Sequence, residues 1–110
     1  MTVRVHAHSR AVQQACELAG LRLRQARLEQ RRSQHDIAER VGISIPTLVH
    51  VESGAPTVSV GTVLETAAVL NIPVFDVPAG QVPRELVLAR AQLASGRQRA
   101  RQKRAPDDDF

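Results

Sequence analysis

The chain has 110 residues, which corresponds to one small domain with tails, and 43% of its residues are hydrophobic although only 2% are aromatic. Its single cysteine excludes an internal disulfide framework, and no apolar run approaches the roughly 20 residues of a membrane span. The net charge of +4 is unevenly distributed, because residues 84–104 hold seven basic side chains and one acidic one, and three aspartates follow. A basic segment favours a polyanionic partner such as a nucleic acid. The protein is expected to lie in the cytoplasm, associated with the nucleoid.

The first third of the chain is expected to form one helix after a disordered start. Residues 1–8 show only weak alternation and are expected to be disordered. From about Ser9 to Arg31 apolar residues recur every three or four positions, which predicts a helix, and Gly20 is expected to bend or restart it. Cys16 lies on this apolar stripe and is interpreted as a core residue, because no histidine stands at a helical spacing from it.

Two short helices joined by a tight turn are predicted next. The first covers residues 34–41, where Ser33 is a suitable N-cap and a glycine follows the last turn. The second covers residues 45–52 after the N-cap Ser44, and Pro46 lies in its first turn, where a missing N–H costs nothing. This spacing is the layout of a helix-turn-helix, although an ordinary helical hairpin has the same spacing.

A fourth helix and a C-terminal helix complete the prediction, and the expected fold class is all-α. Thr57 or Ser59 is expected to cap the fourth helix, and the proline-flanked segment 71–78 predicts either a helical turn or a short extended segment. The apolar residues after it predict a further helix, which ends before the basic tail at Gly96. The predicted boundaries are 1–8 for the disordered start, 9–80 for the compact domain, 81–95 for the C-terminal helix and 96–110 for a disordered basic and acidic tail.

A longer string adds a family resemblance. LRLRQARLEQRRSQHDIAERVGISIPTLVHVESG (21–54) resembles the Cro/C1-type (XRE) helix-turn-helix family, and LETAAVLNIP (64–73) resembles the fourth helix of that family. The resemblance implies a compact five-helix, lambda-repressor-like DNA-binding domain, here with an extra C-terminal helix, that works as a homodimer on a palindromic operator. It also implies a buried ion pair between Arg27 and Glu52; the alternative is that both are surface charges.

A subgroup is suggested by GAPTVSVGTVLETAAVLNIPVFDVP (54–78), followed by the basic segment and the terminal DDDF. This pattern resembles HipB-like antitoxins. The resemblance implies a repressor that autoregulates its operon and restrains a HipA-like Ser/Thr kinase toxin. The alternatives are a stand-alone XRE-family transcriptional regulator and a protein-interaction module with little DNA binding. No catalytic constellation, cofactor or metal site is expected, so the protein is predicted not to be an enzyme.

The predicted DNA contacts depart from the usual family pattern at the start of the recognition helix. Family members that read bases strongly place Arg, Gln or Lys there, whereas Ile45 and Pro46 donate no side-chain hydrogen bond. Ile45 can still pack on a thymine methyl group, and Thr47 and His50 are left for polar contacts. Phosphate contacts are expected to carry much of the affinity. The predicted DNA-binding residues are Arg32, Ser33, Gln34, Arg40, Ser44, Ile45, Pro46, Thr47 and His50.

Two segments outside the helix-turn-helix are expected to contact other molecules. Val74, Phe75 and Val77 are apolar residues left over after the four-helix core, and they are predicted to lie at the dimer interface; the alternative for Phe75 is that it caps the core. The basic residues after Gly96 are expected to follow DNA, to dock on a partner or simply to be solvated.

Overall fold

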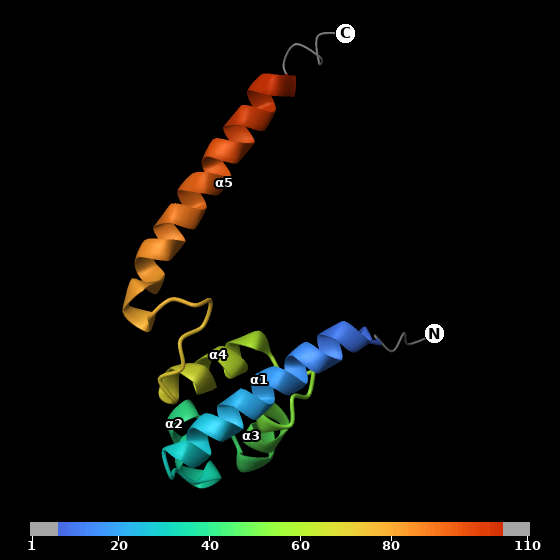
Figure 1. The fold of residues 1–110 in the computed structure, drawn as a ribbon, viewed down its shortest axis with the longest axis vertical. Coiled ribbons are helices and arrows are strands. Elements are labelled where there is room, and N and C mark those ends of the chain that lie inside the picture. Colours follow the sequence, from blue (N-terminus) through green and yellow to red (C-terminus); the bar gives the residue numbers. More distant parts are fainter. Residues whose placement is uncertain (1–6, 105–110) are drawn as a thin grey trace. The chain divides into compact units, whose positions relative to one another are not determined.

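The structure is a computed structural model and describes residues 7–104, all of whose regular structure is helical. The elements are α1 (Arg10–Glu29), α2 (Gln34–Val41), α3 (Ile45–Glu52), α4 (Val60–Val69), the 3₁₀ helix η1 (Ala79–Gln81) and α5 (Val82–Arg104) (Figure 1). The predicted all-α fold class is confirmed. The chain divides into two units, of which the first ends at Val74 and contains α1 to α4, and the second begins at Phe75 and contains η1 and α5.

Serine N-caps define the starts of the four helices in the first unit. In each case the serine hydroxyl oxygen accepts a hydrogen bond, 3.0 to 3.2 Å long, from the backbone N–H three residues later. This bond satisfies one of the N–H groups that a helix start leaves without an intrahelical partner. Of the two alternatives for α4, Ser59 is the cap and Thr57 is not. The four caps are Ser9, Ser33, Ser44 and Ser59.

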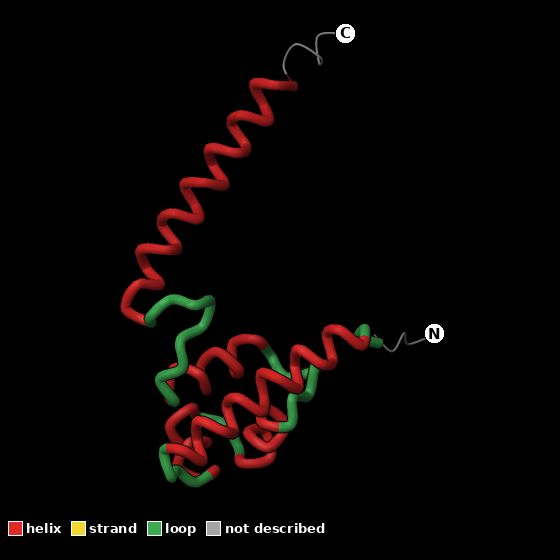
Figure 2. The backbone as a smooth tube through the Cα atoms, in the orientation of Figure 1, coloured by secondary structure: helices red, strands yellow, loops and turns green. Residues whose placement is uncertain are grey.

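The apolar core of the first unit joins all four of its helices, which lie close together in Figure 2. Helix α3 packs against α1 and α2, and α2 also packs against α4. The core holds side chains from each helix, so that α3 is supported from behind on two sides. Its buried apolar residues are Leu23, Ile37, Ala38, Leu48, Val51, Ala67 and Leu70.

Gly20 does not restart the first helix, and α1 runs unbroken past it. The reason for a glycine at this position is packing. A Cβ atom on Gly20 would lie 2.6 Å from the carbonyl oxygen of Glu52 and 2.7 Å from the nitrogen of Gly54. Gly54 has a φ of +75°, and a Cβ there would lie 2.5 Å from the Cα of Glu17. The two glycines therefore allow α1 to cross the end of α3 with backbone against backbone.

The second unit consists mainly of α5. Phe75 and Asp76, which precede it, both adopt positive φ angles of 62° and 57°, so the segment 71–78 forms turns and contains neither a helix nor a strand. Helix α5 continues to Arg104, which corrects the predicted end at residue 95 and the predicted tail from 96 as far as residue 104. Arginine, glutamine, alanine and lysine are good helix formers, and together they outweigh the cost of about 1 kcal/mol for Gly96. Residues 1–6 and 105–110, with the terminal DDDF, lie outside the described residues.

None of the helices between residues 7 and 104 combines the length and the hydropathy that crossing a membrane requires.

Candidate nucleic-acid interface

The turn between α2 and α3 places the first turn of α3 at the surface. Gly42 ends α2 in the left-handed conformation, with a φ of 82°, and its N–H donates to the carbonyl oxygen of Ala38 at 2.9 Å. Two residues later Ser44 caps α3. Leu48 and Val51 are buried on the opposite side of α3 and hold it against the core. The α2–turn–α3 segment therefore has the geometry of a helix whose start is presented to another molecule.

The exposed face of α3 is mainly apolar. Ile45 and Val49, one helical turn apart, are 41% and 43% exposed, and Pro46 and His50 form an exposed row beside them. Isoleucine and valine have no hydrogen-bonding groups but can contact a thymine methyl group. Val49 was not among the predicted contacts, although its spacing of four residues from Ile45 would have placed it on the same face.

Polar groups on this face come from three side chains. The Ser44 hydroxyl accepts from the backbone N–H of Thr47 at 3.2 Å and lies 2.8 Å from the Thr47 hydroxyl, so the two side chains partly satisfy each other. The imidazole of His50 is exposed and has no hydrogen-bond partner within residues 7–104. His50 therefore offers the least committed polar group of α3.

A buried ion pair anchors the C-terminal end of α3. Arg27 of α1 donates from Nε to Oε2 of Glu52 at 2.6 Å and from Nη2 to Oε1 at 3.0 Å. The third nitrogen of Arg27 donates to the carbonyl oxygen of Arg32 at 3.0 Å, and Gln34 Nε2 donates to Glu52 Oε1 at 3.2 Å. Arg27 and Glu52 are both buried, so they are not surface charges. The pair links the end of α3 to α1 and to the start of α2.

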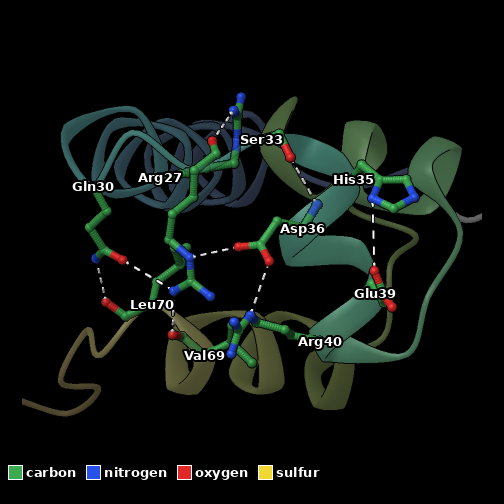
Figure 3. A network of polar contacts seen from close by, with 10 residues as sticks. Arg27, Gln30, Ser33, His35, Asp36, Glu39, Arg40, Val69 and Leu70 are labelled. Carbon is green, nitrogen blue, oxygen red and sulfur yellow. Dashed lines mark hydrogen bonds and ion pairs between the residues drawn. The ribbon is translucent and has the colours of Figure 1, made fainter.

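Asp36 of α2 lies between Arg40 of the same helix, which is labelled in Figure 3, and Arg32 of the preceding turn. Arg32 donates from Nε to one carboxylate oxygen at 3.0 Å, and Arg40 donates from Nε to the other at 3.1 Å. The hydrogen bond from Arg32, followed by that from Arg40, holds the pKa of Asp36 below its ordinary value. Arg40 is exposed, so its remaining N–H groups are accessible to an external anion.

The turn between α1 and α2 also caps the C-terminal end of α4 (Figure 3). Gln30 Nε2 donates to the carbonyl oxygen of Leu70 at 2.8 Å, and Arg32 Nη1 donates to that of Val69 at 3.1 Å. A cation at this position also interacts favourably with the negative end of the helix dipole. Arg32, a predicted phosphate contact, is thus half-buried and bonded within its own domain.

A comparison with protein families agrees with this geometry. A family described as a helix-turn-helix domain has a model that matches residues 18–78, more than half of the chain. The chain belongs to this helix-turn-helix family. The match supports an XRE-like domain and a DNA-binding regulator. No curated protein and no solved structure matches the chain.

The helix-turn-helix domain carries a shallow cleft of about 260 Å³ beside α3. Arg24 of α1 contributes to its wall and is exposed, although the sequence did not predict it as a contact. Helical spacing places Arg24 on α1, but only the packing of α1 against α3 brings it beside α3. The cleft is lined by Arg24, Gln34, Val49, Glu52 and Ser53.

The predicted dimer residues have different environments. Val74 packs against the core of the helix-turn-helix domain, and Val77 is half-buried. Phe75 is 79% exposed, so its ring is available to another chain. Within residues 7–104 there is no cluster of three or more potential metal ligands.

Proposed function

We propose that the protein is a transcriptional repressor that binds a palindromic operator as a homodimer, with the start of α3 in the major groove. The observation that carries this proposal is the division of α3 into two faces. Leu48 and Val51 are buried behind it, while Ile45, Val49 and His50 are exposed on the opposite side. A helix fixed from behind with its N-terminal turn exposed is the arrangement that reads base edges in helix-turn-helix proteins.

In this proposal, α3 recognises methyl groups and shape more than hydrogen-bond patterns. Ile45 and Val49 contact thymine methyl groups, Pro46 packs beside them, and His50 donates to a guanine acceptor. Ser44 and Thr47 supply weaker polar contacts at the cap.

Phosphate contacts come from the residues around α2. The start of α2, at Ser33 and Gln34, offers backbone N–H groups and the positive end of a helix dipole to a phosphate. Arg40 and Arg24 add exposed guanidinium groups. We assign Arg32 the role of holding the start of α2 in position against α4, because its guanidinium donates to Asp36, Gln30 and the carbonyl oxygen of Val69. These contacts make the affinity for DNA dependent on salt concentration.

We further propose that this repressor is a HipB-like antitoxin of the cytoplasm, which represses its own operon and restrains a HipA-like kinase. The support for this role is the resemblance of residues 54–78 to that subgroup. A stand-alone XRE-family regulator shares the same DNA-binding site, and the two differ in whether a kinase is bound. Co-purification of the chain with the product of a neighbouring kinase reading frame tests the antitoxin role, and absence of a complex contradicts it.

The DNA-binding proposal is tested by fluorescence anisotropy with the DNA upstream of the protein's own reading frame. Val49→Glu places a negative charge on the α3 face and is expected to weaken binding at least about tenfold, because the polyanionic DNA repels the carboxylate and the apolar contact with a thymine methyl group is lost. The matched control is Val12→Glu, because Val12 is 44% exposed and lies in the first turn of α1. Both variants change the net charge equally, so equal losses would contradict the assignment of α3 as the DNA-reading helix.

A second variant addresses selectivity. His50→Ala is expected to reduce the preference for the operator over a scrambled duplex by about tenfold, the usual effect of losing one base contact. The expected result is weaker operator binding with unchanged binding to the scrambled duplex. A loss that is equal on both duplexes would place His50 on a phosphate instead.

A further inference from the structure

Helix α5 carries leucines that no other described residue of its own unit covers. Every side chain from residue 82 to residue 101 is exposed, including Leu86, Val87, Leu88 and Leu93. Helices in water are stabilised mainly by packing an apolar face, and exposed apolar patches of this kind mark interaction surfaces. The apolar residues of α5 therefore indicate a surface that binds another helix or chain.

The spacing of the small and apolar residues indicates a coiled coil. Six of them alternate along α5 at intervals of four and three residues, which corresponds to positions d and a of a heptad repeat. No charged residue interrupts this stripe. Its members are Val82, Leu86, Ala89, Leu93, Gly96 and Ala100. The other two large apolar residues, Val87 and Leu88, fall at positions b and c, outside the stripe.

The charges beside this stripe indicate which helix covers it. Glu85 occupies position g and Arg90 the following position e, and within residues 7–104 neither has an ion-pair partner. In a parallel pair of helices, position g of one chain meets the next position e of the other, five residues further along. Two copies of α5 therefore form the Glu85–Arg90 pair twice. An antiparallel pair places g against g and e against e, and does not bring these two residues together.

We propose that α5 binds a second copy of itself as a parallel two-stranded coiled coil over residues 82–96. The proposal deepens the dimer of the proposed function, on which it rests, by naming the element that joins the two chains. Beyond Gly96 the chain is basic, and Arg97, Arg99 and Arg101 of two parallel copies repel one another. Pairing ends there, and the separated basic ends remain accessible to DNA phosphates.

Two heptads give a weak association by themselves, since the helices bury little area. Binding of both helix-turn-helix domains to one operator raises the effective concentration of the two α5 helices and strengthens their pairing. We therefore expect the free protein to associate reversibly at micromolar or higher concentrations.

The test is sedimentation equilibrium of the full chain without DNA, comparing Leu86→Gln with Leu88→Gln. In a single chain the two leucines are equivalent, being 47% and 46% exposed. Because each dimer loses two buried leucines, Leu86→Gln is expected to raise the dissociation constant by about a hundredfold, while Leu88→Gln leaves it unchanged. Equal effects of the two variants, or a wild-type chain that stays monomeric up to several hundred micromolar, would overturn the proposal.

A charge exchange tests the parallel orientation. Glu85→Arg and Arg90→Glu each place like charges in contact and are expected to weaken the dimer several-fold, whereas the double variant restores it. A double variant that stays as weak as the single variants overturns the parallel pairing. The Val49→Glu variant separates this proposal from DNA binding, because it is expected to lose operator binding and to dimerise as the wild type does. A weaker dimer in Val49→Glu would place the contact between chains in the helix-turn-helix domain instead.

Discussion

The close contact between α1 and α3 predicts how glycine-to-alanine substitution changes the free energy of unfolding at two positions. Gly20 and Gly61 both lie within helices, α1 and α4 respectively. A Cβ at Gly61 would meet no atom within 4 Å, whereas a Cβ at Gly20 would lie 2.6 to 2.7 Å from three backbone atoms of residues 51 to 54. We therefore expect glycine-to-alanine substitution to have opposite effects on the free energy of unfolding at the two positions.

The magnitudes follow from helix propensity and packing. Alanine in place of glycine favours a helix by roughly 0.5 to 1 kcal/mol, and Gly61→Ala is expected to stabilise the domain by about that amount. At Gly20 the same gain is opposed by overpacking, which typically costs about 1 to 3 kcal/mol. The clashing atoms belong to the backbone, so they cannot rotate away as a side chain would. Gly20→Ala is therefore expected to destabilise the domain by about 2 kcal/mol.

Urea unfolding followed by circular dichroism measures both effects on the full chain. The difference between the free energies of unfolding of the two variants is expected to be about 2.5 to 3 kcal/mol, which is well resolved by the shift in the unfolding midpoint. If Gly20→Ala stabilises the protein as much as Gly61→Ala, α1 and α3 do not cross as closely as described. Gly20→Ala is also expected to weaken operator binding, because the end of α3 must move to admit the new methyl group.

Two further predictions concern charged groups. Glu52→Gln leaves the buried Arg27 without its counter-charge and is expected to lower the free energy of unfolding by about 3 kcal/mol. The control is Arg24→Ala, on the exposed face of α1, the helix that also carries Arg27; it is expected to change the free energy of unfolding by less than about 0.5 kcal/mol. If urea unfolding shows comparable decreases in the free energy of unfolding for the two variants, the ion pair does not stabilise the fold. Asp36 has a pKa held below its ordinary value of 3.8, so its contribution to stability is full above pH 3.8 and is lost as the pH falls through the lowered value. Asp36→Asn is expected to flatten the fall in Tm below pH 3.8, and parallel curves for variant and wild type would contradict this.

Local signals in the sequence were sufficient to define the helix-turn-helix layout. The caps Ser33 and Ser44 and the left-handed Gly42 act on backbone groups no more than four residues away, so their effects can be read from the chain itself. The expected pairing of Arg27 with Glu52 came from the family resemblance, because helical periodicity relates no residues that are 25 positions apart. The predicted end of α5 at residue 95 is too early, because the segment after Gly96 has no apolar stripe to indicate a helix although it is rich in helix formers.

The sequence by itself determined where the helices of the DNA-binding unit begin, because capping and helical periodicity depend on neighbouring residues. Only the tertiary structure decided what several of those residues do. Gly20 suggested a bend along the chain but permits close packing against Gly54 in the fold. Arg32, which is predicted to contact a phosphate, also donates to a carbonyl group 37 residues away. Such roles depend on atoms that folding brings together from distant positions, and no local pattern specifies them.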